Sequence, residues 1–146
     1  MKVTMAPGRY YLGDPCYVFP ESGRQWDNFC DERRRRNDGI VVIDGHRIVA
    51  FSTDRGDGVY EEKDGRAVCA VESGMIGLVP VAFFGHDEYR RGGADAAGIV
   101  IEFGRSFECS AKRGVLTFGE YVIDTRVQAV FTECEEMVWP AMNPDD

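Results

Sequence analysis

Asp14 and Cys16 are the first residues of the chain whose types and spacing could carry chemistry. They lie in Tyr10-Tyr11-Leu12-Gly13-Asp14-Pro15-Cys16-Tyr17-Val18, an aromatic strand pattern interrupted by glycine and proline. Because Pro15 cannot donate to a strand ladder and holds Asp14 extended, we expect a bulge or corner that aims both side chains in fixed directions. In one interpretation Cys16 is a nucleophile and His46 or His86 is its base, although the sequence places neither histidine next to Cys16. In the other, Cys16 is a small buried side chain and Asp14 accepts hydrogen bonds from backbone N–H groups.

A second polar segment, residues 52–60, combines two carboxylates with glycines that permit a tight backbone. Asp54 and Asp57 could face a cation, but the alternating acids and closing glutamate of a helix-loop-helix calcium site are missing, so we expect no metal. Tyrosines and arginines could instead line a pocket for a nucleotide-like ligand through stacking and charge-assisted hydrogen bonds. The candidate ligand-binding residues are Tyr10, Tyr17, Asp54, Asp57 and Tyr60.

Standard catalytic motifs are missing from the sequence. It has no dinucleotide fingerprint, phosphate-binding loop, paired His-Glu zinc spacing or Gly-x-Ser-x-Gly elbow, so no cofactor is expected. Gly74 and Gly77 interrupt a strand-like segment, which predicts a bulge or a close backbone approach to another strand or to a ligand.

Composition excludes several classes of function. With 146 residues and 44% hydrophobic content, we expect one domain, residues 1–146, whose tail frays from about residue 140. The five scattered cysteines indicate a reduced, cytoplasmic protein, and no apolar run approaches the roughly 20 residues that span a bilayer. A net charge of −8 disfavours duplex nucleic acid as a partner.

The elements that must position these residues are mostly strands. Asp44-Gly45 between two alternating runs predicts a tight hairpin, and residues 62–65 and 111–114 predict two more, the third joining 99–107 to 115–118. Residues 86–98 suggest a surface loop. We therefore predict an α+β, mainly β domain: a curled or barrel-like antiparallel sheet with one N-terminal helix.

The predicted helix covers about residues 23–36, with Ser22 as its cap. Trp26, Phe29 and Cys30 share one face of it, which predicts an apolar stripe. The run Arg33 to Arg36 suits the negative pole of the helix and is either a solvated helix end or an anion-binding patch.

Seven pieces of the sequence, taken in order, carry a resemblance that covers roughly residues 7–125. They are Gly8-Arg9-Tyr10-Tyr11-Leu12-Gly13-Asp14-Pro15-Cys16-Tyr17-Val18, Trp26-Asp27, Gly56-Asp57-Gly58-Val59-Tyr60, Glu72-Ser73-Gly74-Met75-Ile76-Gly77-Leu78-Val79-Pro80, Cys109-Ser110, Phe118-Gly119 and Ile123-Asp124-Thr125. Together they resemble a group of small uncharacterised proteins of tailed bacteriophages and prophages, in which aspartate is frequent where this chain has Glu72. The segment 126–146 has no counterpart in that resemblance.

The resemblance implies a small accessory protein expressed in a bacterial cytoplasm during infection. We expect it to act by stoichiometric binding, with counter-defence as one form: it would occupy a host protein or sequester a small anionic ligand such as a nucleotide. One alternative is a small hydrolase-like or transferase-like enzyme that uses Asp14, Cys16 or Asp57, with His46 as a further candidate. Another is a minor virion or assembly component, and the oligomeric state stays open.

Overall fold

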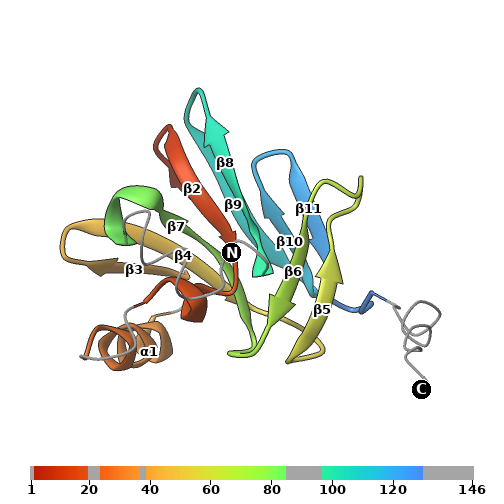
Figure 1. The fold of residues 1–146 in the computed structure, drawn as a ribbon, viewed down its shortest axis with the longest axis horizontal. Helices are drawn as coiled ribbons and strands as arrows, with labels where there is room; N and C mark the ends of the chain where they lie inside the picture. The colour runs from red at the N-terminus through yellow and green to blue at the C-terminus, as the bar shows by residue number, and fades with distance from the viewer. Residues whose placement is uncertain (1, 20–23, 37–38, 85–96, 130–146) are drawn as a thin grey trace, which may run out of the picture.

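The structure is a computed structural model that describes residues 2–19, 24–36, 39–84 and 97–129 (Figure 1). Antiparallel strands dominate it. The longest described helix has eleven residues and precedes most of the strands, and residues 81–84 after β7 are also helical. The elements are β1 (Lys2–Met5), β2 (Gly8–Gly13), the 3-10 helix η1 (Pro15–Val18), α1 (Gln25–Arg35), β3 (Ile40–Ile43), β4 (His46–Ser52), β5 (Gly58–Glu61), β6 (Val68–Val71), β7 (Met75–Pro80), β8 (Ile99–Phe103), β9 (Phe107–Lys112), β10 (Val115–Phe118) and β11 (Tyr121–Asp124).

The strands form three antiparallel sheets that curl around a shared core. Their orders are β3-β4-β7-β2-β8, β1-β9-β10-β11 and β5-β6. A single bridge between Glu62 and Ile123 attaches the β5-β6 pair to β11. The prediction of an α+β, mainly β fold is confirmed. Of the two predicted forms, curled or barrel-like, the structure has the curled one, because the described strands stay in separate sheets and do not close into a barrel.

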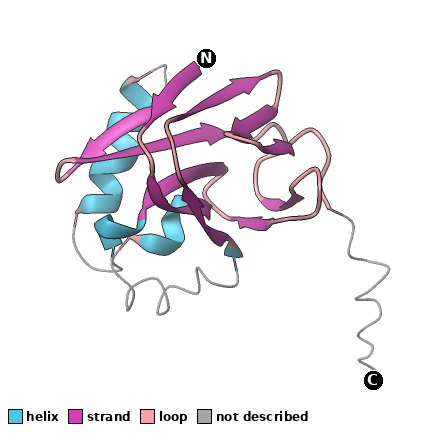
Figure 2. Ribbon diagram, turned by 90° about the horizontal axis from the view of Figure 1, so that it is seen from above, coloured by secondary structure: helices cyan, strands magenta, loops and turns pink. Residues whose placement is uncertain are grey.

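Side-chain alternation buries the five-stranded sheet on both of its faces. In β2, Tyr10 and Leu12 enter one core cluster while Tyr11 enters the other. The first cluster fills the space between the sheets, and the second lies under η1 and α1. Figure 2 shows the helical segments gathered at one side of the strands, where they cover the second cluster.

Helix α1 follows the predicted apolar stripe. Phe29 is fully buried, and its ring lies 5.3 Å from that of Trp26 and 5.2 Å from that of Phe19, measured between centroids. The stripe is therefore confirmed, and it docks α1 onto the outer face of the five-stranded sheet. The predicted cap Ser22 lies outside the described residues, and Arg24 at the N-cap makes no side-chain capping bond.

Two of the three predicted hairpins form as expected. Asp44 and Gly45 take φ angles of 51° and 81°, as a two-residue type I′ turn requires, and Gly65 supplies a φ of 78° to the β5–β6 turn. The third prediction is wrong in its first strand. The run 99–107 divides into β8, which pairs with β2, and the start of β9, which pairs with β10 across the turn at Arg113-Gly114.

The predicted corner after Gly13 is a short helix and not a strand bulge. Strand β2 ends at Gly13, and η1 begins at Pro15 with Asp14 as its N-cap residue. The close approach predicted for Gly77 is to another strand, since a Cβ there would lie 2.1 Å from the carbonyl oxygen of Val49 in β4.

Some predictions lie beyond what the structure describes. The predicted loop at 86–98 falls outside the described residues except for its last two positions, and the predicted frayed tail falls wholly outside them. Among the described residues, no helix has the length and apolar character needed to cross a membrane.

Candidate functional site

The buried carboxylate of Asp14 joins two of the motif segments. Its Oδ1 accepts hydrogen bonds from the Cys16 N–H at 2.9 Å and from the Ser73 hydroxyl at 2.6 Å. Its Oδ2 accepts from the N–H groups of Glu72 and Ser73, each at 2.7 Å. Four donors to one fully buried carboxylate replace the water that it lost on folding, so η1 and the β6–β7 turn are held together here.

The third motif segment reaches the same end of the molecule through Asp57. The Asp57 Oδ1 lies 3.9 Å from the position that a Cβ would take on Gly74. The Thr53 N–H donates to the Gly74 carbonyl at 2.9 Å, and the Thr53 hydroxyl donates to the Gly56 carbonyl at 2.7 Å. The 10–18, 52–60 and 72–80 segments therefore converge, although nothing in their spacing along the chain requires this.

Cys16 does not have the surroundings of a catalytic thiol. Burial raises the pKa of Cys16, and the neighbouring carboxylate of Asp14 raises that pKa further, so the thiol stays protonated near neutral pH. His46, one of the two candidate bases, has its ring against Phe83, with centroids 5.7 Å apart, and His86 lies outside the described residues. Within the described part of the chain, no hydrogen bond links His46 to Cys16.

The three candidate tyrosines have different surroundings. Tyr60 is fully buried and Tyr10 nearly so, and their hydroxyls donate to the carbonyls of Gly56 and Ala6 at 2.7 and 2.8 Å. Their rings are thus packed in the core instead of lining a pocket. Tyr17 is half-buried. Burial raises the pKa of its hydroxyl, and a hydrogen bond with Glu72 raises that pKa further.

We call the Asp14 carboxylate with its four hydrogen-bond donors the Asp14 clamp. A hollow of about 260 Å³ opens beside it, between α1 and the β6–β7 turn. Residues from α1, from the end of β4, from the β6–β7 turn and from the start of β7 line it: Cys30, Arg33, Arg34, Ser52, Ser73, Gly74 and Met75. We call it the α1 hollow. Its two arginines belong to the predicted run. Ser52, Ser73 and Met75 lie in motif segments but are not among the predicted site residues, because they become neighbours only through strand pairing and the clamp.

The arginine run divides between the α1 hollow and the helix surface. Arg33 donates from Nε to the Ala50 carbonyl at 2.8 Å, and Arg34 pairs with Asp31 one turn earlier on α1. Arg35 and Arg36 are outside the hollow lining and pair with Glu32 at 2.8 and 3.8 Å. A guanidinium has five N–H donors, so Arg34 can pair with Asp31 and still donate to an anion.

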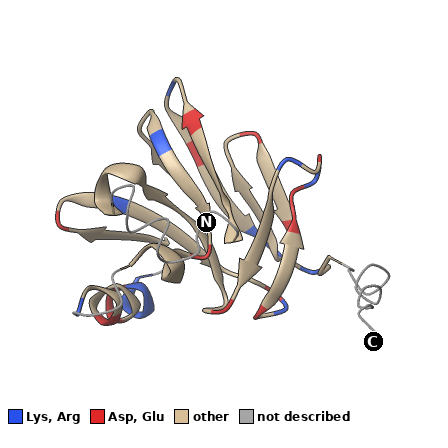
Figure 3. Ribbon diagram, in the orientation of Figure 1, with Lys and Arg blue, Asp and Glu red and all other residues tan. Residues whose placement is uncertain are grey.

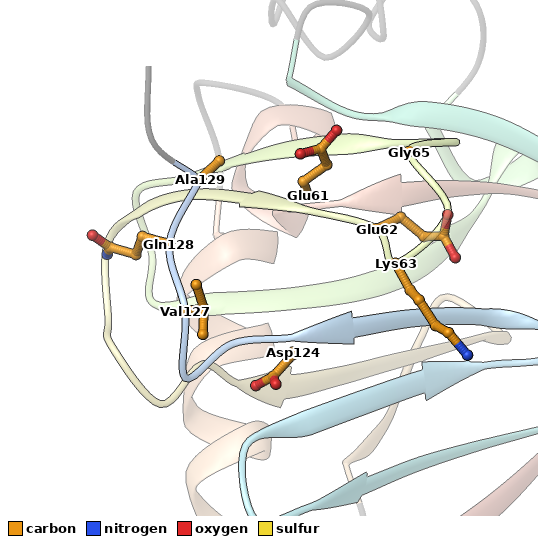
Figure 4. A pocket seen from close by; sticks show the side chains of 8 residues that line it. All are labelled: Glu61, Glu62, Lys63, Gly65, Asp124, Val127, Gln128 and Ala129. Carbon is orange, nitrogen blue, oxygen red and sulfur yellow. The ribbon is translucent and has the colours of Figure 1, made fainter. Parts of the chain in front are cut away.

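A second hollow, of about 310 Å³, lies between the β5–β6 turn and the segment after β11 (Figure 4). Two carboxylates on its wall already have cationic partners. Arg66 holds the pKa of Glu62 at about 2, and Arg126 holds the pKa of Asp124 at about 2. The N–H groups of Asp64, Arg66 and Val122 also donate to Glu62. The Val122 bond to Glu62 connects β5-β6 to β11, and the Arg126–Asp124 pair is local to the end of β11, so the role of these contacts is structural.

The described residues do not contain a group of three or more His, Cys, Asp or Glu side chains placed to hold a metal ion. Asp54 is exposed, and its N–H donates to the Thr125 hydroxyl at 2.8 Å. The carboxylates of Asp54 and Asp57 therefore stay candidates for ligand contact only.

Charge is unevenly distributed along the chain. Residues 2–19, 24–36, 39–84 and 97–129 contain fifteen acidic and fifteen basic side chains, so their net charge is zero. Residues 130–146 contain five acidic and no basic side chains. Figure 3 shows the basic residues of α1, which carries the arginines of the α1 hollow. The described surface near the hollow is thus compatible with an anion despite the acidic sequence.

In comparisons with known proteins, no family model, curated protein or solved structure matches this chain.

Proposed function

We propose that the protein is a non-catalytic binding protein that takes up one small anionic ligand in the α1 hollow. The observation that carries this proposal is the lining itself: the arginines of α1 and the Ser52 hydroxyl of β4 surround one space. Arginine forks and hydroxyl groups together are the usual partners of phosphate and carboxylate groups.

The chemistry of the converged motifs supports binding over turnover. Asp14 uses its carboxylate for four hydrogen bonds, and burial keeps the Cys16 thiol protonated, so neither is prepared to act as a base or nucleophile. The clamp instead fixes Ser73, one wall of the hollow, against η1. A rigid wall lowers the entropy cost of ligand binding.

The biological setting is part of the proposal and rests on the resemblance to tailed-phage and prophage proteins. An accessory protein in an infected bacterial cytoplasm could act against host defence by sequestering a small anionic signalling molecule. It would then work stoichiometrically, and its effect would scale with its amount in the cell.

The proposal is tested by titrating inorganic phosphate into three proteins and following the Gly74 amide by NMR. The wild type should show a saturable shift, and Arg34→Gln should weaken binding about 10- to 100-fold, the range expected for one charge-assisted contact. Arg35→Gln is the matched control, because Arg35 is on the same helix turn but pairs with Glu32 outside the hollow. Equal phosphate affinity in Arg34→Gln and the wild type would contradict the proposal.

A further inference from the structure

We infer that a third hollow, beside the loop after β4, binds the carboxylate end of an N-acylated apolar amino acid, either free or at the end of a peptide. The hollow has a volume of about 310 Å³ and is lined by Arg55, Arg126, Val127 and Gln128. We call it the Arg55 hollow. Val127 and Gln128 also line the second hollow (Figure 4). None of the four residues lines the α1 hollow, so the inference does not depend on the proposed function.

Arg55 supplies the charge of this hollow. Its Nε donates to the Arg126 carbonyl at 3.0 Å, which anchors the guanidinium on the segment after β11. The side chain is exposed, and within the described part of the chain it has no ion-pair partner. Its two terminal nitrogens therefore keep N–H donors for a ligand, and together they can meet both oxygens of a carboxylate.

Arg126 is a wall of the hollow and not a second open charge. Its Nε and Nη2 each donate to the Asp124 carboxylate at 2.8 Å. Asp124, and to a smaller degree Asp54, raise the pKa of Arg126, and neither carboxylate lines the hollow. Because Arg126 is balanced in this way, Arg55 is the cation that a ligand can pair with. One such cation suits a carboxylate with a single charge better than a phosphate dianion.

Gln128 offers a hydrogen-bond acceptor beside that cation. Its Nε2 donates to the Asp57 carbonyl at 2.8 Å, which leaves Oε1 to accept from an N–H group of a ligand. A Cβ on Gly58 would overlap the Gln128 amide, so the glycine makes room for it. The Gly56-Asp57-Gly58 motif, which the α1 hollow does not use, thus holds Gln128 in place.

Val127 gives the hollow an apolar side. Its side chain is 65% exposed, more than that of any other large hydrophobic residue that the structure describes. Covering it with an apolar group of the ligand would remove both surfaces from water, which favours binding.

The lining therefore asks for a carboxylate, an amide N–H and an apolar side chain in one small group. An N-acylated apolar amino acid has all three, and so has the last residue of a peptide chain. The volume of about 310 Å³ is at the lower end of the roughly 300–1,000 Å³ typical of small-molecule sites, which suits one residue and not a longer segment.

The test titrates N-acetyl-leucine and N-acetyl-leucinamide, which differ only in the carboxylate, into the full chain and follows the Val127 amide and the Arg55 Nε–H by NMR. The wild type should bind the acid in a saturable way and the carboxamide at least about 10-fold more weakly, because the carboxamide cannot form the charge-assisted bonds. Arg55→Gln should weaken binding of the acid about 10-fold or more for the same reason. Arg105→Gln is the matched control, because it removes the same charge from an exposed residue outside the hollow.

Two further comparisons test the apolar contact and the source of the ligand. Val127→Ser should weaken binding of N-acetyl-leucine about 3- to 10-fold and leave that of acetate within about twofold, because acetate has no side chain to cover Val127. A pentapeptide that ends in leucine distinguishes the two sources. Tighter binding of the peptide than of N-acetyl-leucine assigns the site to a peptide end, and equal binding assigns it to the free acylated amino acid.

The outcomes also separate this inference from the proposed function. Equal affinity of the wild type for the acid and the carboxamide, or wild-type affinity of Arg55→Gln for the acid, overturns the inference and leaves the α1 hollow untouched. Arg34→Gln should bind N-acetyl-leucine as the wild type does, and a loss there would place the acid in the α1 hollow instead. Since the comparison of acid with carboxamide uses the wild type, it does not depend on the folding of any variant.

Discussion

Ser73 donates both its backbone N–H and its hydroxyl to the carboxylate of Asp14, at 2.7 and 2.6 Å, across 59 residues of sequence. The pair fixes the β6–β7 turn against η1. It also places Ser73 between the buried clamp and the α1 hollow, because the same residue lines that hollow. The clamp therefore holds one wall of the proposed ligand site in place.

Asp14→Asn should destabilise the fold by about 2–4 kcal/mol. The NH₂ group of the new side chain is a hydrogen-bond donor, and in this buried site it would face N–H or O–H groups that are donors too. The free energy of unfolding in urea measures this change. Asp44→Asn is the control: Asn is well accepted at the positive φ of that turn, and little loss is expected. Equal stability of the two variants would show that the clamp contributes little.

Gly77→Ala should destabilise the protein by about 1–3 kcal/mol or more, because the new Cβ would meet the Val49 carbonyl oxygen at 2.1 Å and the Ala50 Cα at 2.9 Å. Strands β4 and β7 would have to separate. Thermal unfolding monitored by circular dichroism gives the change. Gly104→Ala is the matched control, since nothing lies within 4 Å of a Cβ there; a similar melting shift for both would argue against the close approach.

The protein should lose stability as pH falls from about 4.5 to about 2, because the pKa of Glu62 drops from 4.5 to about 2 on folding. A carboxyl with a depressed folded-state pKa stabilises above its unfolded-state value and stops doing so as it is protonated. The loss should be up to about 3 kcal/mol.

Urea unfolding across this pH range, in the wild type and in Glu62→Gln, checks the assignment to Glu62. Glu62→Gln should show a flatter pH dependence, and the exposed neighbour variant Glu61→Gln should keep the wild-type slope. An unchanged slope in Glu62→Gln would assign the effect to other carboxylates.

Cys16 should react slowly with iodoacetamide at neutral pH, because burial and the Asp14 carboxylate raise its pKa and keep it protonated. Peptide mass spectrometry after timed alkylation gives the rate at this residue. The same peptide in the urea-unfolded protein provides the reference rate. A folded-state rate at or above the reference would favour a nucleophilic role for Cys16.

Local sequence signals predicted the turns and the helix correctly where the cause is local. Asp44-Gly45 needs positive φ at both positions, and Trp26, Phe29 and Cys30 share a helix face whatever packs on it. The run 99–107 was read as one strand although residues 104–106, Gly-Arg-Ser, interrupt its apolar pattern. The change of sheet there depends on pairing with β2 and β1, which are far away in sequence.

The candidate site could be predicted only in its parts. Asp14 was expected to accept backbone N–H bonds, and it does, but its partners Glu72 and Ser73 belong to another sheet connection. Tyr60 has the pattern of a strand aromatic, which does not reveal whether its ring faces a ligand or the core. The α1 hollow joins a helix end to two strand ends, a relationship that spacing alone does not encode.

Native mass spectrometry of gently purified protein tests the central claim of stoichiometric ligand binding most directly. Wild type, Arg34→Gln and the control Arg35→Gln would be expressed in bacteria and compared before and after denaturation. We predict one added mass of a few hundred daltons on the wild type and on Arg35→Gln. It should be lost on denaturation and missing from Arg34→Gln. Bare protein in all three samples, or the same added mass on all three, would contradict the account.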